Sequence, residues 1–212
     1  MYNEIFHKID TTSFKSFAET SRMVVERLAN DIDLVISLLD APLSDEKLLM
    51  KSECYDFLDK IVCYSDDESG VSMRVSLFND KYANRIHYHR WDYCACVLSG
   101  MYEQSIYGIY DGIEITELYP YDPLIIENIG PKASYVLDHR IIHSISAVPN
   151  TVSICVRGPA YYDSFQAVDP KTNSSWIQYG AKFEAAEEKE MKRISPNILN
   201  QRIDYIKSIL RK

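Results

Sequence analysis

The feature that most constrains the fold is a series of short apolar or alternating runs between about Val71 and Gly158, separated by turn-forming residues. Such runs are typical of an antiparallel β-barrel or sandwich. The predicted strands cover residues 72–78, 85–89, 93–99, 103–110, 113–119, 123–127, 134–137, 141–148 and 152–157. Asp111 with Gly112 is the best hairpin signal, and Ser99 with Gly100 is another. We therefore expect a mainly β fold.

Helical patterns flank this region on both sides. Apolar residues at helical spacing predict one long amphipathic helix over residues 11–40, and residues 44–46 supply the N-cap and acidic first turn of a second helix reaching to about Val62. Near the C-terminus, residues 183–194 predict a charged helix, and Ser195 with Pro196 predicts the start of a terminal helix. The N-terminal helices are expected to pack on the barrel, with a partner-binding module as the alternative.

The chain length of 212 residues suits a single domain with helical additions. The patterns divide it into N-terminal helices that pack on the barrel (1–66), the barrel itself (67–165) and a C-terminal extension with helices (166–212). We expect the predicted barrel to carry one functional site.

Composition favours a small-molecule partner. The net charge of -8 argues against nucleic acid or an anionic membrane, because both require clustered positive charge. No apolar stretch has the length of a signal peptide core or a membrane span, so the expected location is cytoplasmic.

Five cysteines are an odd number without zinc-ribbon spacing, so we expect reduced and mostly buried thiols. Cys94 and Cys96 would share one face of a strand. Packing is the simpler interpretation of this pair, and a metal or redox pair is the alternative.

Histidine is rare, with five in the chain, yet His87 and His89 lie two apart on a predicted strand and would project from the same face. Two imidazoles on one face predict a metal site if a third ligand converges on them. His143 and His139, on or beside a later predicted strand, compete for the third position.

The stretch IHYHRWDYCACVLSG resembles the first motif of the cupin superfamily, in which His-x-His is followed by a glutamate and then by an apolar strand ending in glycine. Cys94 stands at the glutamate position, as in the thiol dioxygenase branch that includes cysteine dioxygenase and uses three histidines without a carboxylate. The resemblance covers roughly residues 70–165. It implies a cupin barrel, a double-stranded β-helix of jelly-roll type, with α-helices before and after it.

The second cupin motif adds a histidine about fifty residues downstream, and here His143 lies 54 residues after His89. The resemblance therefore implies that His87, His89 and His143 hold the metal. His143 is preferred to His139 because it begins the apolar strand that follows the ligand in the family. His139 would then lie behind the ligands or at the mouth of the site.

The sequence departs from the thiol dioxygenases at several positions. Their Ser-His-Tyr relay aligns with Ser153, Cys155 and Arg157, so the relay and the cysteine–tyrosine crosslink are expected to be absent. Cys94 would then contact Cys155 or pack without a chemical role. Both thiols are candidates for positions beside the ligands. No arginine matches the one that binds the carboxylate in the family, since Arg74 lies several residues late, and cysteine itself is a doubtful substrate.

Three other residues are candidates for binding and chemistry. Arg157 would share the inward face of Cys155 and orient a substrate carboxylate, with a salt bridge to an acid such as Glu114 or Asp163 as the alternative. Arg85, two residues before His87, would face the same side of the strand and is a second candidate. The alternative is that Arg85 caps the barrel rim. Tyr93 would reach the pocket, and Tyr161 is an equal further candidate.

The function that these features predict is a non-haem Fe(II)-dependent dioxygenase-type oxidoreductase that uses O2 as co-substrate and acts on a small anionic thiol or amino-acid derivative. Three histidines also suit Zn(II) or another divalent metal. The alternatives are a non-oxidative metal enzyme, such as an isomerase, a lyase or one with a zinc-assisted step, and a non-enzymatic metabolite-binding cupin. A homodimer is compatible with the sequence.

Overall fold

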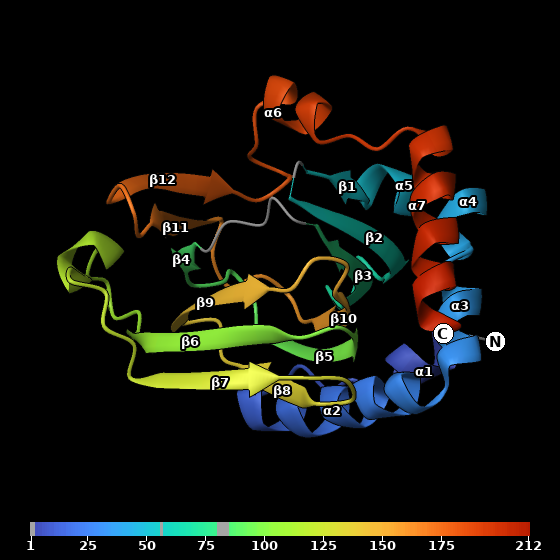
Figure 1. The fold of residues 1–212 in the computed structure, drawn as a ribbon, viewed down its shortest axis with the longest axis horizontal. Helices are drawn as coiled ribbons and strands as arrows, with labels where there is room; N and C mark the ends of the chain where they lie inside the picture. The colour runs from blue at the N-terminus through green and yellow to red at the C-terminus, as the bar shows by residue number, and fades with distance from the viewer. Residues whose placement is uncertain (1–2, 56, 80–84) are drawn as a thin grey trace.

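The computed structural model describes residues 3–55, 57–79 and 85–212. Two six-stranded antiparallel sheets face each other, and most of the helices cover the outside of the first (Figure 1). The first sheet has the order β1 (Glu53–Cys54), β2 (Leu58–Ser65), β3 (Ser72–Phe78), β10 (Val152–Arg157), β5 (Tyr93–Ser99) and β8 (Ser134–Leu137). The second has the order β12 (Ser174–Tyr179), β11 (Ser164–Asp169), β4 (Ile86–His87), β9 (Ile141–Ala147), β6 (Tyr102–Ile109) and β7 (Ile125–Ile129).

Helices precede and follow the strands. They are α1 (Asn3–Phe6), α2 (Phe14–Asn30), α3 (Ile32–Leu38), α4 (Ala41–Ser44), α5 (Glu46–Lys51), the 3-10 helix η1 (Ile115–Leu118), α6 (Ala186–Met191) and α7 (Pro196–Leu210). None of these described helices has the length and apolarity needed to cross a membrane.

The strand order is that of a jelly roll. Its central strands are β3-β10-β5-β8 in one sheet and β4-β9-β6-β7 in the other, so most consecutive strands lie in opposite sheets. This arrangement, which cupins share, agrees with the fold class predicted from the sequence. The strands form two facing sheets rather than one closed barrel, and strand residues run from Glu53 to Tyr179, beyond both ends of the predicted barrel segment.

The main hydrophobic core lies between the first sheet and the helices. Phe17 and Leu28 of α2 and Ile203 of α7 are buried in one cluster with Cys94 and Cys96 of β5. In Figure 1, α2 runs along one side of the first sheet and α7 stands beside α3 and α4. Both ends of the chain therefore pack on the sheet, and the other sheet face is left for the site.

The long helix predicted over residues 11–40 is two helices. Ser13 caps α2, but Asp31 interrupts the helix because its side chain accepts a hydrogen bond from Leu34 N at 3.0 Å and caps α3 instead. Aspartate favours this local capping over helix continuation. The amphipathic pattern continues across the break, which is why periodicity alone did not reveal it.

The prediction of a second helix as far as Val62 was wrong beyond Lys51. Asp45, rather than Ser44, caps α5, and the helix ends before Ser52. Residues Leu58–Ser65 form β2, which is largely buried. A short apolar run fits a buried helix and a buried strand equally well, and the pairing with β3 decides for the strand.

Three further predictions were wrong. Residues 113–119 contain the 3-10 helix η1 instead of a strand, and Ile115 N donates to Gln166 Oε1 at 2.7 Å. Asp111 and Gly112 therefore lie in a loop and not in a hairpin. The charged helix predicted over 183–194 is restricted to α6, while β11 and β12, which no pattern predicted, extend the second sheet.

Gly100 offers a sharp test of the turn that carries the chain from the first sheet to the second. Its φ is +81°, and a Cβ there would lie 2.8 Å from Thr151 Cα, whereas Gly112, with φ +104°, has open space around it. We expect Gly100→Ala to lower the free energy of unfolding by about 2 to 3 kcal/mol and Gly112→Ala by about 1 kcal/mol. Urea titration checks both, and equal losses would contradict a steric role for Thr151.

Candidate metal centre

The two sheets bring His87, His89 and His143 together. His87 on β4 is the direct antiparallel partner of His143 on β9, so both rings point to the same side of the second sheet. His89 follows two residues later, and its backbone N donates to His139 O at 3.0 Å. The ring centroids lie 4.7 Å (His87 to His89), 4.8 Å (His87 to His143) and 5.0 Å (His89 to His143) apart.

The nitrogen atoms of these rings suit a divalent metal. His89 Nε2 and His143 Nε2 are 2.9 Å apart, and one nitrogen from each of the three rings lies within 4.8 Å of the others. Two ligands on one ion at about 2.1 Å would lie about 3 Å apart. His87 Nδ1 donates to Arg85 O at 2.9 Å, which leaves its Nε2 lone pair free to bind. The donor set therefore fits the metal that the sequence predicts.

Burial keeps these imidazoles neutral. It lowers the pKa of His87 to about 4, and it lowers the pKa of His89 and of His143 well below the usual histidine range. A metal ligand must offer a lone pair and not a proton. All three rings are thus ready to bind a cation near neutral pH.

Tyr93 lies beside the histidines. Its hydroxyl is 3.3 Å from His143 Nε2, and its ring centroid is 4.5 Å from that of His89. Burial raises the pKa of Tyr93 well above the usual tyrosine value. The phenol therefore stays protonated and can donate a hydrogen bond within the site.

His139 belongs to a different cluster. Its Nδ1 lies 2.8 Å from Asp92 Oδ1, its ring stacks on Tyr161 at 4.1 Å, and Tyr161 Oη donates to Asp92 Oδ2 at 3.1 Å. Asp138, the other acid near His139, is held by Arg140 at 2.9 Å. These groups satisfy one another, and the cluster holds the backbone that receives the His89 N–H.

Facing the histidines, the inner side of the first sheet carries cations between small side chains. Strand pairing aligns Arg74 of β3 with Cys155 of β10, while Lys60 of β2 pairs with Ser76 and Arg157 pairs with Ser72. The small side chains leave a cleft of about 510 Å³ between the sheets, lined by the cations and by the three histidines. Its size suits a small-molecule ligand.

Both predicted arginines line this cleft. The Arg157 guanidinium lies 5.2 Å from the Trp91 ring centroid, and no ion pair with Glu114 or Asp163 is found within the described residues. Arg85 lies 4.2 Å from the Phe57 ring centroid, next to the histidines in sequence. Burial, followed by repulsion from Arg74, lowers the pKa of Arg157 to about 10.

Lys60 and Arg74 were missed as site residues. The second helix was predicted to reach about Val62, so Lys60 was not considered on a strand face. Arg74 was set aside only because its spacing differs from the family pattern. Its parity with Ser72 and Ser76, which also line the cleft, was the signal that could have placed it there.

The two cysteines lie on opposite faces of the first sheet. Cys155 lines the cleft and is the direct partner of Arg74 and Ala95. Cys94 pairs with Val156 on the other face and is buried against α2 in the main core. Cys94 therefore packs, the simpler of its two interpretations, and the place beside the ligands predicted for it is contradicted.

Glu53 links the cations at the cleft entrance. It lies 2.7 Å from Lys192 Nζ and 3.3 Å from Lys60 Nζ. Burial alone would raise the pKa of Glu53, but the charges of Lys60 and Lys192 outweigh it and hold the pKa at about 2. The carboxylate thus neutralises much of the charge of Lys60.

This shift predicts how stability depends on pH. A folded-state pKa of about 2, against an ordinary value of 4.5, stabilises the fold above about pH 4.5, and the gain is lost as the pH falls toward 2. We expect Glu53→Gln to lower the free energy of unfolding by about 2 kcal/mol at pH 7 and by little near pH 2. Urea titration across this range checks it, and a constant difference would contradict the assignment.

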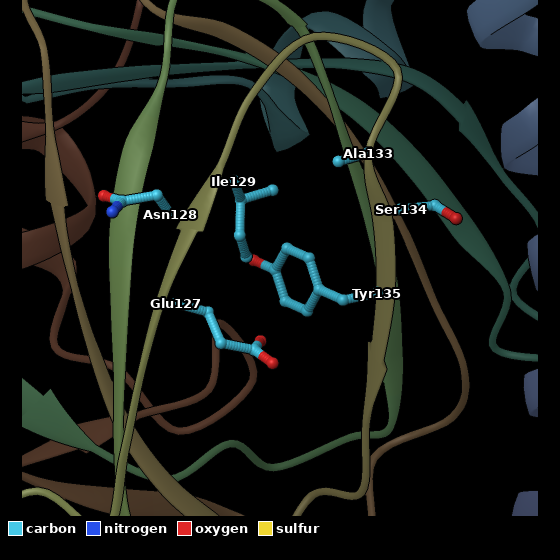
Figure 2. Close-up of a pocket in the computed structure, with 6 residues that line it drawn as sticks. All are labelled: Glu127, Asn128, Ile129, Ala133, Ser134 and Tyr135. Carbon is cyan, nitrogen blue, oxygen red and sulfur yellow. The ribbon is translucent and has the colours of Figure 1, made fainter.

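A second pocket, of about 410 Å³, opens between β7 and β8 (Figure 2). The Tyr135 side chain extends from β8 across the gap toward Ile129 and Glu127 of β7. Among the described residues that line it, Glu127 is the one charged group, and none is a histidine or a cysteine. The chemistry of the molecule is therefore concentrated in the cleft.

No protein-family model matches this sequence, and no curated protein is detectably similar to it. Similar solved structures include ectoine synthase from P. lautus, with a TM-score of 0.41 and 13% identity over 67% of this chain and 94% of that one. An RmlC-like cupin from Shewanella frigidimarina has a TM-score of 0.39 and 17% identity, covering 53% of this chain and 86% of that one. The ribosomal oxygenase YcfD from Escherichia coli has a TM-score of 0.34 and 14% identity over 42% of this chain, which spans only 23% of that protein. Likenesses this distant say nothing about activity, and the jelly-roll order and the converging histidines are features of this chain itself.

Proposed function

We propose that the protein is a non-haem Fe(II)-dependent oxygenase of the three-histidine cupin type that acts on a small anionic substrate, such as a thiol or an amino-acid derivative. The observation that carries the proposal is the pairing of His87, His89 and His143 on one wall of a cleft with Lys60 and Arg157 among the cations that line it. The cleft thus offers a metal site and an anion site that face each other.

His87, His89 and His143 would hold Fe(II) through three neutral imidazoles, and the ion would supply a double positive charge and a site for O2 chemistry beside the substrate. The protein supplies the rest of the chemistry through orientation. Arg157 would hold the anionic group of the substrate, so that its reactive atom faces the histidines, and Tyr93 Oη would donate a hydrogen bond there. The cleft walls would limit access of water.

A dioxygenase reaction suits this cleft because both oxygen atoms enter the product and no external reductant is required. For a thiolate, RS⁻ and O2 give the sulfinate RSO2⁻, in which sulfur is oxidised by four electrons and O2 is reduced by the same number. The relay seen in cysteine dioxygenase is replaced here, since Ser153, Cys155 and Arg157 all line the cleft. This replacement favours a substrate other than cysteine.

An oxygen electrode tests the proposal. Protein reconstituted anaerobically with Fe(II) is mixed with a panel of small thiols and amino acids that carry an acidic group, and we expect substrate-dependent O2 uptake that protein loaded with Zn(II) does not show. Fe(II)-loaded protein should also bind nitric oxide, an O2 analogue, before any substrate is found. Substrate turnover in the absence of O2 would instead assign a non-oxidative metal enzyme.

A further inference from the structure

Two guanidinium groups in the cleft have no carboxylate in direct contact within the described residues. Arg74 Nε is buried without a hydrogen-bond partner, and neither Arg74 nor Arg157 forms an ion pair in the part of the chain that the structure describes. The Arg74 guanidinium lies 5.3 Å, and that of Arg157 5.2 Å, from the Trp91 ring centroid. An indole face stabilises a cation only weakly compared with a carboxylate.

The strand register places these two groups side by side. Cys155 is opposite Arg74, and Arg157 follows Cys155 by two residues on the same strand, so the arginines are diagonal neighbours on one face of the sheet. Such neighbours lie about 7 to 8 Å apart at the backbone, within reach of long side chains. Their charges repel each other, and each guanidinium has also lost part of its hydration.

Several other described cations near the cleft have a nearby carboxylate, while Arg85, on the side of the histidines, contacts aromatic rings. Lys60 and Lys192 share Glu53, and Lys192 also contacts Glu184 at 2.6 Å. Arg90 feels the negative charge of Asp163 and lies 3.4 Å from Tyr162 O. On the inner wall of the first sheet, Arg74 and Arg157 are thus the described cations without a direct ion pair, and the charge of Glu53 that reaches both is shared with Lys60 and Lys192.

An unpaired buried cation lowers the stability of the free protein. A ligand of opposite charge offsets this loss when it binds, so an unpaired buried cation favours a ligand site. Two adjacent guanidinium groups match two negative charges carried on one small group or on two neighbouring carboxylates. A monoanion would leave one of the two arginines unpaired.

We infer that Arg74 and Arg157 together form a binding site for a dianion, and that the substrate carries a phosphate monoester or a pair of carboxylates at the end that faces β3 and β10. The inference rests on the proposed function for the statement that this dianion belongs to the substrate. Both chemistries share a double negative charge and several oxygen acceptors. Trp91 lies next to both guanidinium groups.

Calorimetric titration tests the site directly. The full chain, loaded with Fe(II) under anaerobic conditions, is titrated with malonate, with inorganic phosphate and with acetate as the monoanion. We expect the preferred dianion to bind at least about tenfold more tightly than acetate, because only a dianion pairs both guanidinium groups. Tighter binding of phosphate assigns a phosphate monoester, and tighter binding of malonate assigns a dicarboxylate.

Variants locate the site. Arg74→Gln and Arg157→Gln should each weaken binding of the dianion by about tenfold or more and change acetate binding far less. Arg211→Gln, at an exposed position after α7, is the matched control and should bind like the natural protein. Equal affinity for dianions and acetate, or an unchanged preference in both cleft variants, would overturn the inference.

Folding is measured on the same variants. Because the arginines are uncompensated in the ligand-free protein, Arg74→Gln and Arg157→Gln should leave the Tm unchanged or raise it. A clear fall in Tm of either variant would show a structural partner and would count against a ligand site.

The result remains separable from the oxygenase proposal. The His143→Ala variant lacks one of the three imidazole ligands, but it should still bind the dianion through the two arginines. Dianion binding without O2 uptake would support the anion site and contradict the oxygenase proposal. O2 uptake without a preference for dianions would support the oxygenase proposal and contradict the anion site.

Discussion

Replacing His143 by alanine is expected to reduce bound metal from about one ion per chain to less than about a tenth, and His87→Ala and His89→Ala should do the same. Each imidazole supplies one of three ligands, and loss of even an outer hydrogen-bond partner of a ligand costs about 10- to 100-fold in metal affinity, so loss of a ligand should cost more. Metal analysis after anaerobic reconstitution and equilibrium dialysis measures the effect.

The matched control for this series is His139→Gln. His139 lies close to the triad in sequence and space, but its ring pairs with Asp92 and stacks on Tyr161. We expect this variant to retain at least most of its metal. Loss of metal in His139→Gln together with retention in His143→Ala would transfer the third ligand to His139. Retention of metal in all three alanine variants would show that these histidines do not hold it.

Replacing Asp92 by alanine is expected to lower the free energy of unfolding by about 3 to 5 kcal/mol. Asp92 Oδ1 accepts from both the backbone N and Nδ1 of His139 at 2.8 Å, and Oδ2 accepts from Tyr161 Oη at 3.1 Å. Its side chain is 4% exposed, so water cannot replace these bonds without rearrangement. Urea unfolding followed by circular dichroism measures the loss.

Asp92→Asn keeps one acceptor oxygen in nearly the same volume and should lose only about 1 to 2 kcal/mol. Because His139 O receives the His89 N–H, the alanine variant should also bind metal more weakly at temperatures where it remains folded. If Asp92→Ala lowers the free energy of unfolding by less than about 1 kcal/mol, this cluster does not hold the backbone at His139 in place.

The metal site was accessible from the sequence because its geometry is local. His87 and His89 are two residues apart, and strand parity alone puts them on one face. The pairing of His87 with His143 joins two strands far apart in the chain, and it came from the resemblance to cupins and not from any pattern in the residues. Parity predicted that Arg157 faces inward, and Arg157 and Tyr93 both line the cleft.

The cationic wall could not be assembled in this way. It depends on β2 lying beside β3, and residues 58–65 satisfy a helical and a strand pattern equally well until tertiary pairing selects one. Cys94 shows the opposite error, since the motif alignment assigned it to the site although its parity is opposite to that of Tyr93 and Cys155. The partly exposed strands β11 and β12 lack the apolar runs that made the other strands predictable.

The uncompensated arginines also affect how the protein would acquire its metal. A divalent cation that enters the cleft meets the field of Arg74 and Arg157 across a medium of low polarity, so its affinity is reduced until an anion arrives. By thermodynamic linkage, the anion must then raise metal affinity by the same factor by which the metal raises anion affinity. The two ligands would therefore bind with positive heterotropic cooperativity, and protein purified without its anion should lose metal on dialysis more readily than protein that retains it.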